Sequence, residues 1–149
     1  MVDTSRKPPR LERVLLVDDD PDIRRFIESI FRANGFEDIA SADDGEEGLQ
    51  LASDLLPDLI ATNVMMPKLH GFEMVRWIRE DVGLTEPCII FVTAKALPSD
   101  RALGLEVGAD EYIIKPFTPA DLSRKVDAAL AGTAARREGL TARRREAGR

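Results

Sequence analysis

Side chains suited to phosphoryl chemistry follow four separate apolar runs of this sequence. Asp18 and Asp19 come directly after one run, Asn63 after another, Thr93 at the end of a third and Lys115 after a fourth. Carboxylates bind Mg²⁺, a hard cation that takes oxygen ligands. A hydroxyl can hydrogen-bond a phosphoryl oxygen, and an ammonium can neutralise the charge that develops on it. Each residue alone also suits a helix cap or a turn, so the prediction depends on their lying together.

These runs belong to a regular alternation of short apolar segments and amphipathic segments. Residues 21–34 carry apolar side chains at helical spacing, with Asp20 as a natural N-cap and Gly35 as a C-terminal cap. The same alternation predicts five strands, at residues 13–17, 38–42, 59–62, 88–92 and 112–114. It predicts five helices, at residues 21–34, 44–56, 72–82, 99–107 and 118–131, with Gly132 just past the last.

Strands that alternate with helices of this length indicate βαβ units and right-handed crossovers. The apolar runs lack strict alternation, as expected for strands that are covered on both faces. We therefore predict an α/β fold with a doubly wound, five-stranded parallel sheet and helices on both faces, a flavodoxin-like three-layer sandwich. Ligand sites of such sheets lie at the carboxyl ends of the strands, which is where the polar residues fall.

Composition restricts the function classes. A length of 149 residues predicts one domain, and 44% apolar with 32% charged residues is typical of a globular protein. The single cysteine, Cys88, excludes an intrachain disulfide and suits a reducing cytoplasm. No apolar run approaches the length of a membrane span, and the first residues form no signal peptide. We therefore expect a cytoplasmic protein without membrane insertion.

Charge is distributed unevenly along the chain. Six arginines and two glutamates give residues 132–149 a charge of +4, which leaves −10 for the rest of a chain whose net charge is −6. An acidic body argues against direct DNA binding by the domain. The predicted organisation is a flexible segment at 1–10, a folded domain at 11–131 and a basic tail at 132–149 that is partly disordered or helical. An acidic partner, a nucleic acid or a membrane surface are open alternatives for contacts of this tail.

Four motifs in register resemble the receiver domain of bacterial two-component response regulators, in particular the chemotaxis-Y-like type. They are Val-Leu-Leu-Val-Asp-Asp-Asp at 14–20, Pro-Asp-Leu-Ile-Ala-Thr-Asn-Val-Met-Met-Pro at 57–67, Phe-Val-Thr-Ala at 91–94 and Tyr-Ile-Ile-Lys-Pro-Phe at 112–117. The resemblance covers nearly the whole predicted domain. It implies a single-domain response regulator of a phosphorelay that acts through protein–protein contacts, and no enzyme beyond self-phosphorylation and self-dephosphorylation.

The resemblance implies a metal site and a departure from it. Asp18 and Asp19 match the acidic pair that organises Mg²⁺, and the backbone carbonyl of Met65 would be a further ligand. The family normally has an aspartate phospho-acceptor where Asn63 stands. An amide is a very poor nucleophile, so acyl-phosphate formation is expected to fail. Mg²⁺ binding is expected to weaken because one anionic ligand has become neutral. A natural variant and an introduced Asp→Asn change both fit Asn63.

The resemblance also implies a switch. Thr93 matches the hydroxyl that turns toward the phosphoryl group, and Tyr112 matches an aromatic residue that changes rotamer on activation. Lys115 matches the lysine that pairs with the phosphoryl group, and Lys115–Pro116 matches the cis-peptide site of the family. Implied partners are a histidine kinase or phosphotransfer protein, and an effector at the face of the fourth helix, fifth strand and fifth helix, about residues 99–130. Homodimer formation is left open.

Three other functions compete with the leading prediction. One is a phosphorylation-independent adaptor or decoy module. Another is the receiver part of a truncated transcription regulator, with the arginine-rich residues as a linker. The third is a metal-dependent phosphatase, which ranks last because Met65 stands where a second aspartate would be needed.

Overall fold

The fold is a three-layer sandwich built around one parallel sheet. The computed structural model describes residues 7–147, with side-chain surroundings up to residue 135. The strands are β1 (Val14–Val17), β2 (Ile39–Ala42), β3 (Leu59–Thr62), β4 (Cys88–Thr93) and β5 (Glu111–Ile114). The helices are α1 (Pro21–Ala33), α2 (Gly45–Leu55), α3 (Gly71–Glu80), α4 (Pro98–Glu106) and α5 (Pro119–Ala147).

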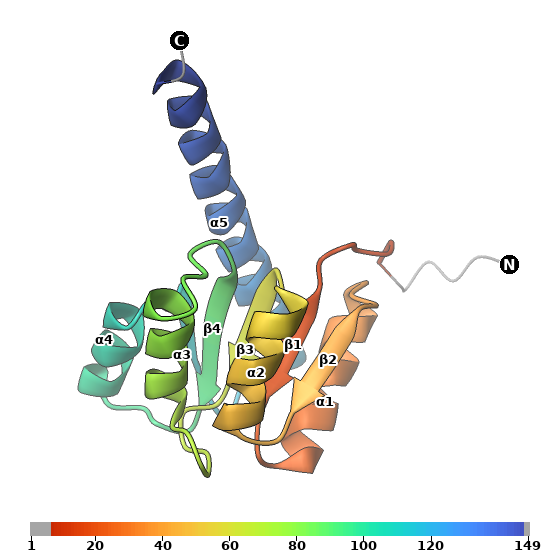
Figure 1. Ribbon diagram of the computed structural model, residues 1–149. Coiled ribbons are helices and arrows are strands. Elements are labelled where there is room, and N and C mark those ends of the chain that lie inside the picture. Colours follow the sequence, from red (N-terminus) through yellow and green to blue (C-terminus); the bar gives the residue numbers. More distant parts are fainter. Residues whose placement is uncertain (1–6, 148–149) are drawn as a thin grey trace, which may run out of the picture.

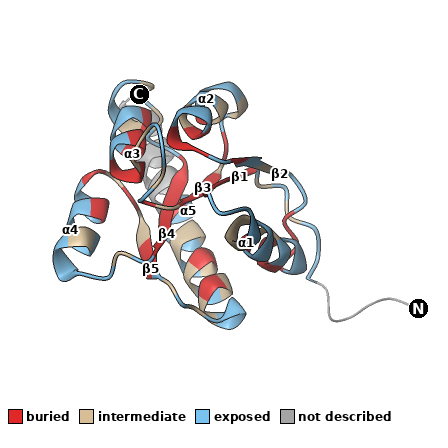
Figure 2. Cartoon of the chain, turned by 90° about the horizontal axis from the view of Figure 1, so that it is seen from below, coloured by how far each residue is buried: buried red, intermediate tan, exposed pale blue. Residues whose placement is uncertain are grey.

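The strand order is β2-β1-β3-β4-β5, and each neighbouring pair is parallel. Helices α1 and α5 cover one face of the sheet, while α2, α3 and α4 lie on the other side (Figure 1; Figure 2). The predicted fold class is therefore confirmed. The order reverses direction between β1 and β3, so the loops after these two strands meet at the carboxyl edge of the sheet.

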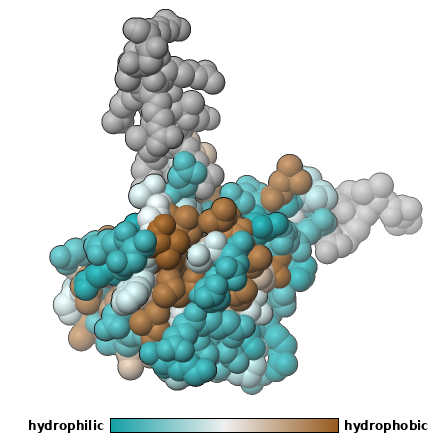
Figure 3. All heavy atoms as spheres, in the orientation of Figure 1, coloured by the Kyte–Doolittle hydropathy of each residue, from teal (hydrophilic) through white to brown (hydrophobic). Residues whose placement is uncertain are grey.

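The core is two apolar layers, one on each face of the sheet. Along β1, Leu15 and Val17 face the layer under α2 and α3, while Val14 and Leu16 face the layer under α1 and α5. All four residues are at most 2% exposed. Figure 3 shows apolar residues gathered among hydrophilic ones on the face that carries α2, α3 and α4. Strands covered on both faces carry near-continuous apolar runs, which explains why the strand positions could be predicted from the sequence.

The last helix differs from the prediction. Helix α5 does not end before Gly132 but continues to Ala147, and it projects beyond the rest of the fold (Figure 1). A glycine inside a helix costs about 1 kcal/mol relative to alanine. The flanking residues are mostly alanine, leucine, arginine and glutamate, which are strong helix formers, and their propensities outweigh that cost. Gly132 is not among the described glycines with positive φ, so it forms no helix C-cap.

The two ends of the chain carry sequence predictions that the structure addresses only in part. Residues 1–6 of the predicted flexible segment, and the side chains of 136–149 in the basic tail, lie outside the described residues. Within residues 7–147, no helix combines the length and the apolar character needed to cross a membrane.

Candidate functional site at the carboxyl edge of the sheet

The sheet register brings the predicted site residues to one edge. Val17 of β1 pairs with Thr62 of β3, so the residues that follow them, Asp18 and Asn63, leave the sheet side by side. In the same way Thr93 of β4 pairs with Ile114 of β5, and the amide of Lys115 donates to the carbonyl of Thr93 at 2.8 Å. Four strands thus deliver a carboxylate, an amide, a hydroxyl and an ammonium to one place.

Asp18 and Lys115 form an ion pair at the centre of this edge. The Lys115 Nζ donates to Asp18 Oδ2 at 3.0 Å, and the other carboxylate oxygen accepts the amide of Asp20 at 2.9 Å. The Asp18 side chain is 4% exposed and that of Lys115 is 18% exposed. A buried carboxylate needs such partners, because desolvation of an unpaired charge is costly. The Lys115–Pro116 peptide bond is cis, as the resemblance implies.

The Asn63 side chain is satisfied by its own loop. Its Oδ1 accepts the Val64 amide at 2.8 Å, and its Nδ2 donates to the Met65 carbonyl at 3.3 Å. A carboxylate has no N–H donor and could not make the second of these contacts. The carbonyl expected to bind a metal is therefore hydrogen-bonded to Asn63, the residue at the expected acceptor position.

The loop after β3 is held close to the site by a glycine. A Cβ on Gly71 would lie 2.2 Å from the carbonyl oxygen of Asn63, so only glycine lets α3 begin so near the strand end. In the same loop the His70 Nε2 lies 3.1 Å from the Met65 sulfur. The Met65 side chain is exposed, while its carbonyl faces Asn63.

Thr93 and Tyr112 are linked through one residue that sequence reasoning missed. The amide of Lys95 donates to Thr93 Oγ1 at 3.2 Å, and its carbonyl accepts the Tyr112 hydroxyl at 2.7 Å. Thr93 and Tyr112 are both buried, at 1% and 0% exposure. Burial, with a smaller contribution from the Asp100 carboxylate, raises the pKa of the Tyr112 hydroxyl above its usual value. Tyr112 therefore stays neutral and acts as a hydrogen-bond donor at physiological pH.

A second cation at the site was also missed by sequence reasoning. The Arg24 Nη1 donates to the carbonyl oxygen of Asp18 at 2.6 Å. Arg24, Asp18 and Asn63 all line one small pocket. Arg24 lies on α1 one turn after the N-cap Asp20, so its spacing alone resembles that of any exposed helical arginine.

The predicted metal residues are unequal in their surroundings. Asp18 is buried, Asp19 is exposed, and Asn63 and the Met65 carbonyl are hydrogen-bonded to each other. All four offer oxygen donors, which suits Mg²⁺. The set carries two carboxylates, one fewer than it would with aspartate at position 63. The donor atoms therefore suit Mg²⁺, but they carry less negative charge than they would with aspartate at position 63.

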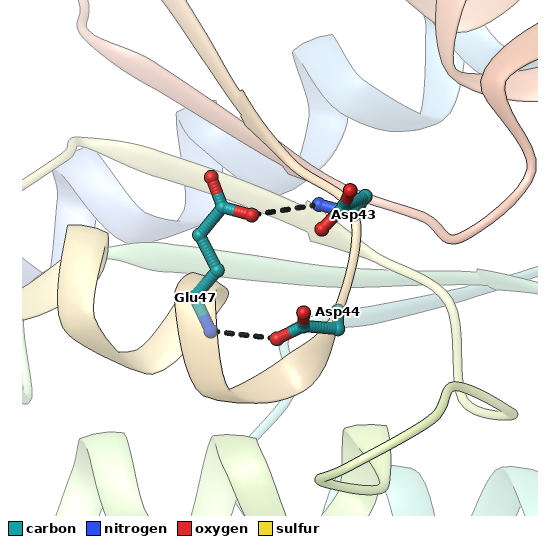
Figure 4. Close-up of side chains that lie close together, drawn as sticks. All are labelled: Asp43, Asp44 and Glu47. Atoms are coloured by element: carbon teal, nitrogen blue, oxygen red, sulfur yellow. Dashed lines mark hydrogen bonds between the residues drawn. The ribbon is translucent and has the colours of Figure 1, made fainter.

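A separate acidic cluster is a helix cap. Within the described residues, the acidic side chains of Asp43, Asp44 and Glu47 are the group close enough to hold a cation. Figure 4 shows instead that they bond the start of α2: Asp44 Oδ1 accepts the Glu47 amide at 2.8 Å, and the Glu47 carboxylate accepts the Asp43 amide at 3.4 Å. The Lys68 Nζ lies 3.3 Å from Asp44. This is a reciprocal N-terminal cap of α2.

Replacing Asp44 with alanine is expected to lower the free energy of unfolding by about 1 kcal/mol at neutral pH, because the cap of α2 is lost. The Glu47 amide, and then the Lys68 ammonium, hold the pKa of the Asp44 carboxyl below its usual value. A lowered folded pKa contributes stability above the unfolded pKa, about 3.9, and that contribution is lost as pH falls through the folded value.

The difference between parent and Asp44→Ala should therefore shrink below about pH 4. Urea unfolding at pH 7 and pH 3 measures it. The exposed neighbour Asp43, changed to alanine, is the matched control and should show little effect at either pH. A difference of the same size at both pH values would contradict the assignment of the Asp44 carboxylate as the cap.

Comparisons with known proteins agree with this geometry. The family model for the response regulator receiver domain matches residues 14–127. The chain is 40% identical over 119 residues to the DNA-binding response regulator MtrA of Mycolicibacterium smegmatis, covering 80% of this chain and 50% of that protein. It is 40% identical over 122 residues to the probable transcriptional regulator ycf27 of Guillardia theta, covering 82% and 46%. The chain thus spans about half the length of the curated relatives it matches.

Solved structures give the same result. The chemotaxis response regulator CheY4 of Vibrio cholerae superposes with a TM-score of 0.74 at 31% identity, covering 80% of this chain and 99% of that one. The receiver domain of the Francisella response regulator 1452 gives a TM-score of 0.74 at 32% identity, covering 82% and 98%.

Proposed function

Because this chain belongs to the response regulator receiver domain family, and so to two-component signalling, we propose that it is a receiver that does not accept a phosphoryl group. The observation that carries the proposal is the hydrogen bonding of Asn63. Its amide bonds Val64 and Met65, and Asp18, Thr93 and Lys115 lie at the same edge of the sheet.

The proposal follows from the chemistry of phosphoryl transfer. A carboxylate oxygen attacks phosphorus, an acyl-phosphate bond forms, and the bond from phosphorus to the donor's leaving group breaks. The amide of Asn63 has no negative charge, and its nitrogen lone pair is delocalised, so the first of these bonds does not form. On this proposal the chain has no enzymatic activity, and Asn63, Thr93 and Lys115 form a pocket without its nucleophile.

The proposal includes weakened binding of Mg²⁺. Receiver domains generally bind Mg²⁺, and here Asp18, Asp19, Asn63 Oδ1 and the Met65 carbonyl are the residues that would hold it. A bound cation would neutralise charge on a transferred phosphoryl group. Lys115 already supplies one positive charge to Asp18, and the Asn63 amide would have to release the Met65 carbonyl.

We also propose that Lys95 transmits the state of Thr93 to Tyr112. Any turn of the Thr93 hydroxyl toward the site breaks its bond with the Lys95 amide. The same residue carries the carbonyl that fixes the Tyr112 hydroxyl. The Tyr112 ring fits against Gly104 of α4, where an added Cβ would lie 2.8 Å from the ring. Movement of the loop after β4 would therefore reach α4 through Tyr112.

The partners proposed for the chain are proteins. A histidine kinase or phosphotransfer protein would dock near the site, and an effector would bind the α4, β5 and α5 face. That face carries exposed apolar side chains, which support a binding role: Leu97, Leu103, Leu105 and Ile114. A cytoplasmic location is part of the proposal, because Cys88 is the single cysteine of the sequence and no intrachain disulfide can form.

Nuclear magnetic resonance of the full chain tests the proposed switch. With Mg²⁺ already present, adding a small-molecule phosphodonor should shift the amide signals of Thr93, Lys95 and Tyr112 in Asn63→Asp and leave them unchanged in the parent. The matched control is Asp43→Asn, which changes one exposed carboxylate outside the site. Equal shifts in parent and Asn63→Asp would contradict the proposal.

A second candidate is favoured by the relatives. The chain spans about half the length of proteins named transcriptional or DNA-binding regulators. It would then be the receiver part of such a regulator, and DNA binding would come from residues outside the folded domain. Salt-dependent retention of this chain on duplex DNA would assign part of that DNA binding to residues 132–149, since the acidic body alone should not bind.

A further inference from the structure

An N-terminal strap, residues 7–10, lies across the end of the fold opposite the site. The amide of Arg10 donates to the Gly35 carbonyl at 2.8 Å, and Arg10 forms a parallel bridge with Phe36. A Cβ on Gly35 would lie 2.2 Å from the carbonyl oxygen of Pro8, and Gly35 has a φ of +96°. Only a residue without a Cβ therefore leaves room for the strap to pass this close to the end of α1. The strap precedes the segment matched by the receiver family, residues 14–127.

The strap binds α5 through Asp127. The Arg10 Nη1 donates to Asp127 Oδ1 at 2.8 Å, and the Lys7 Nζ lies 3.6 Å from the other oxygen of that carboxylate. The Arg10 guanidinium also lies over the Phe36 ring, 4.2 Å from its centroid. Two cations thus pair with a single aspartate of α5, and the Phe36 ring holds one of them, Arg10.

Asp127 lies near the point where α5 leaves the body of the fold. On the body-facing stripe of α5, Leu122 and Val126 are buried in the core and Thr133 is the last buried residue that is described. Beyond that point α5 projects from the fold (Figure 1). Asp127 therefore lies in the last turns that contact the body. The other end of α5 begins at Pro119, four residues after Lys115 of the site.

We propose that residues 7–10 are an electrostatic clasp that fixes the direction of α5 where the helix leaves the body. Its central contact is the ion pair between Arg10 and Asp127. Because α5 runs as one helix from the site edge to the clasp, opening the clasp frees the projecting part of α5 without unfolding the domain. Its ion pairs are partly exposed, with Arg10 at 25% and Asp127 at 43%, so salt should weaken the clasp. This inference does not depend on whether Asn63 accepts a phosphoryl group.

Hydrogen exchange of the full chain, measured by mass spectrometry at low salt, tests the clasp. Arg10→Gln should accelerate exchange about fivefold in α5 from residue 128 onward and leave β1, β3 and β4 unchanged. Arg25→Gln is the matched control, because it removes the same charge from the exposed Arg25–Asp22 pair of α1. Unchanged exchange in α5, or acceleration spread over the whole domain, would overturn the proposal.

Asp127→Asn removes the charge on the α5 side of the same ion pair. It should reproduce the exchange pattern of Arg10→Gln, and the double variant should add little to either single change, because both remove one interaction. High salt should bring the parent close to both variants. Fully additive effects of the two changes would show that Arg10 and Asp127 act separately, and the clasp would be ruled out.

Discussion

The Asn63→Asp variant is expected to bind Mg²⁺ about thirtyfold more tightly than the parent. Even with the dielectric constant of water, a unit charge about 4 Å from a divalent ion contributes about 2 kcal/mol. The change also removes the Nδ2 that donates to the Met65 carbonyl, and so frees that ligand. Calorimetric titration of both chains with Mg²⁺, at the same ionic strength, measures the difference.

The same variant should change stability in a metal-dependent way. Without Mg²⁺, a third carboxylate next to Asp18 and Asp19 adds repulsion, and Asn63→Asp should unfold at a lower urea concentration than the parent. At saturating Mg²⁺ the order should reverse, because the ion stabilises the form that binds it more tightly. If the order does not depend on Mg²⁺, position 63 does not contribute to a metal site.

Removing the Arg79 side chain is expected to lower the free energy of unfolding by about 3–5 kcal/mol. Its Nε and Nη2 both donate to the Gly108 carbonyl, at 3.0 and 2.9 Å, and its Nη1 donates to the Leu84 carbonyl at 3.1 Å. Its Nη2 also donates to Asp110 at 3.2 Å, and both side chains of this pair are 12% exposed. Alanine would leave a largely buried carboxylate without this cation and two carbonyls without these donors.

Urea unfolding of Arg79→Ala measures this loss, which is a large share of the total stability of a typical domain. Arg76→Ala is the matched control, because Arg76 is an exposed arginine of the same helix, α3. A loss as small as that of the control would mean that water replaces the guanidinium contacts with Gly108, Leu84 and Asp110.

The strands and the site edge were predictable because their signals are local. Apolar runs such as the one before Asp18 are interrupted abruptly by polar residues, and parallel strands bring those residues to one edge of the sheet. The adjacency of Asp18 and Asn63, and of Thr93 and Lys115, follows from that rule. The end of α5 was wrongly predicted because the cap preference of one residue, Gly132, was weighted above the propensities of its neighbours.

The remaining contacts left no pattern in the sequence. The bond from Arg24 to the Asp18 carbonyl depends on one rotamer of a helical arginine, and nothing in its spacing marks it. The pairing of Arg10 with Asp127 joins residues 117 positions apart. The Lys95 link uses backbone atoms, which every residue has. Contacts of this kind are determined by tertiary packing and have no local signal in the sequence.

The central claim is that Asn63 alone prevents phosphorylation of an otherwise complete receiver site. Intact mass after incubation with Mg²⁺ and a small-molecule phosphodonor tests this claim. We expect Asn63→Asp to gain one phosphoryl group and the parent to gain none. Asn63→Asp combined with Lys115→Ala is the control, and it should be labelled less because the Lys115 ammonium is lost. Labelling of the parent, or failure of Asn63→Asp to be labelled, would contradict the account.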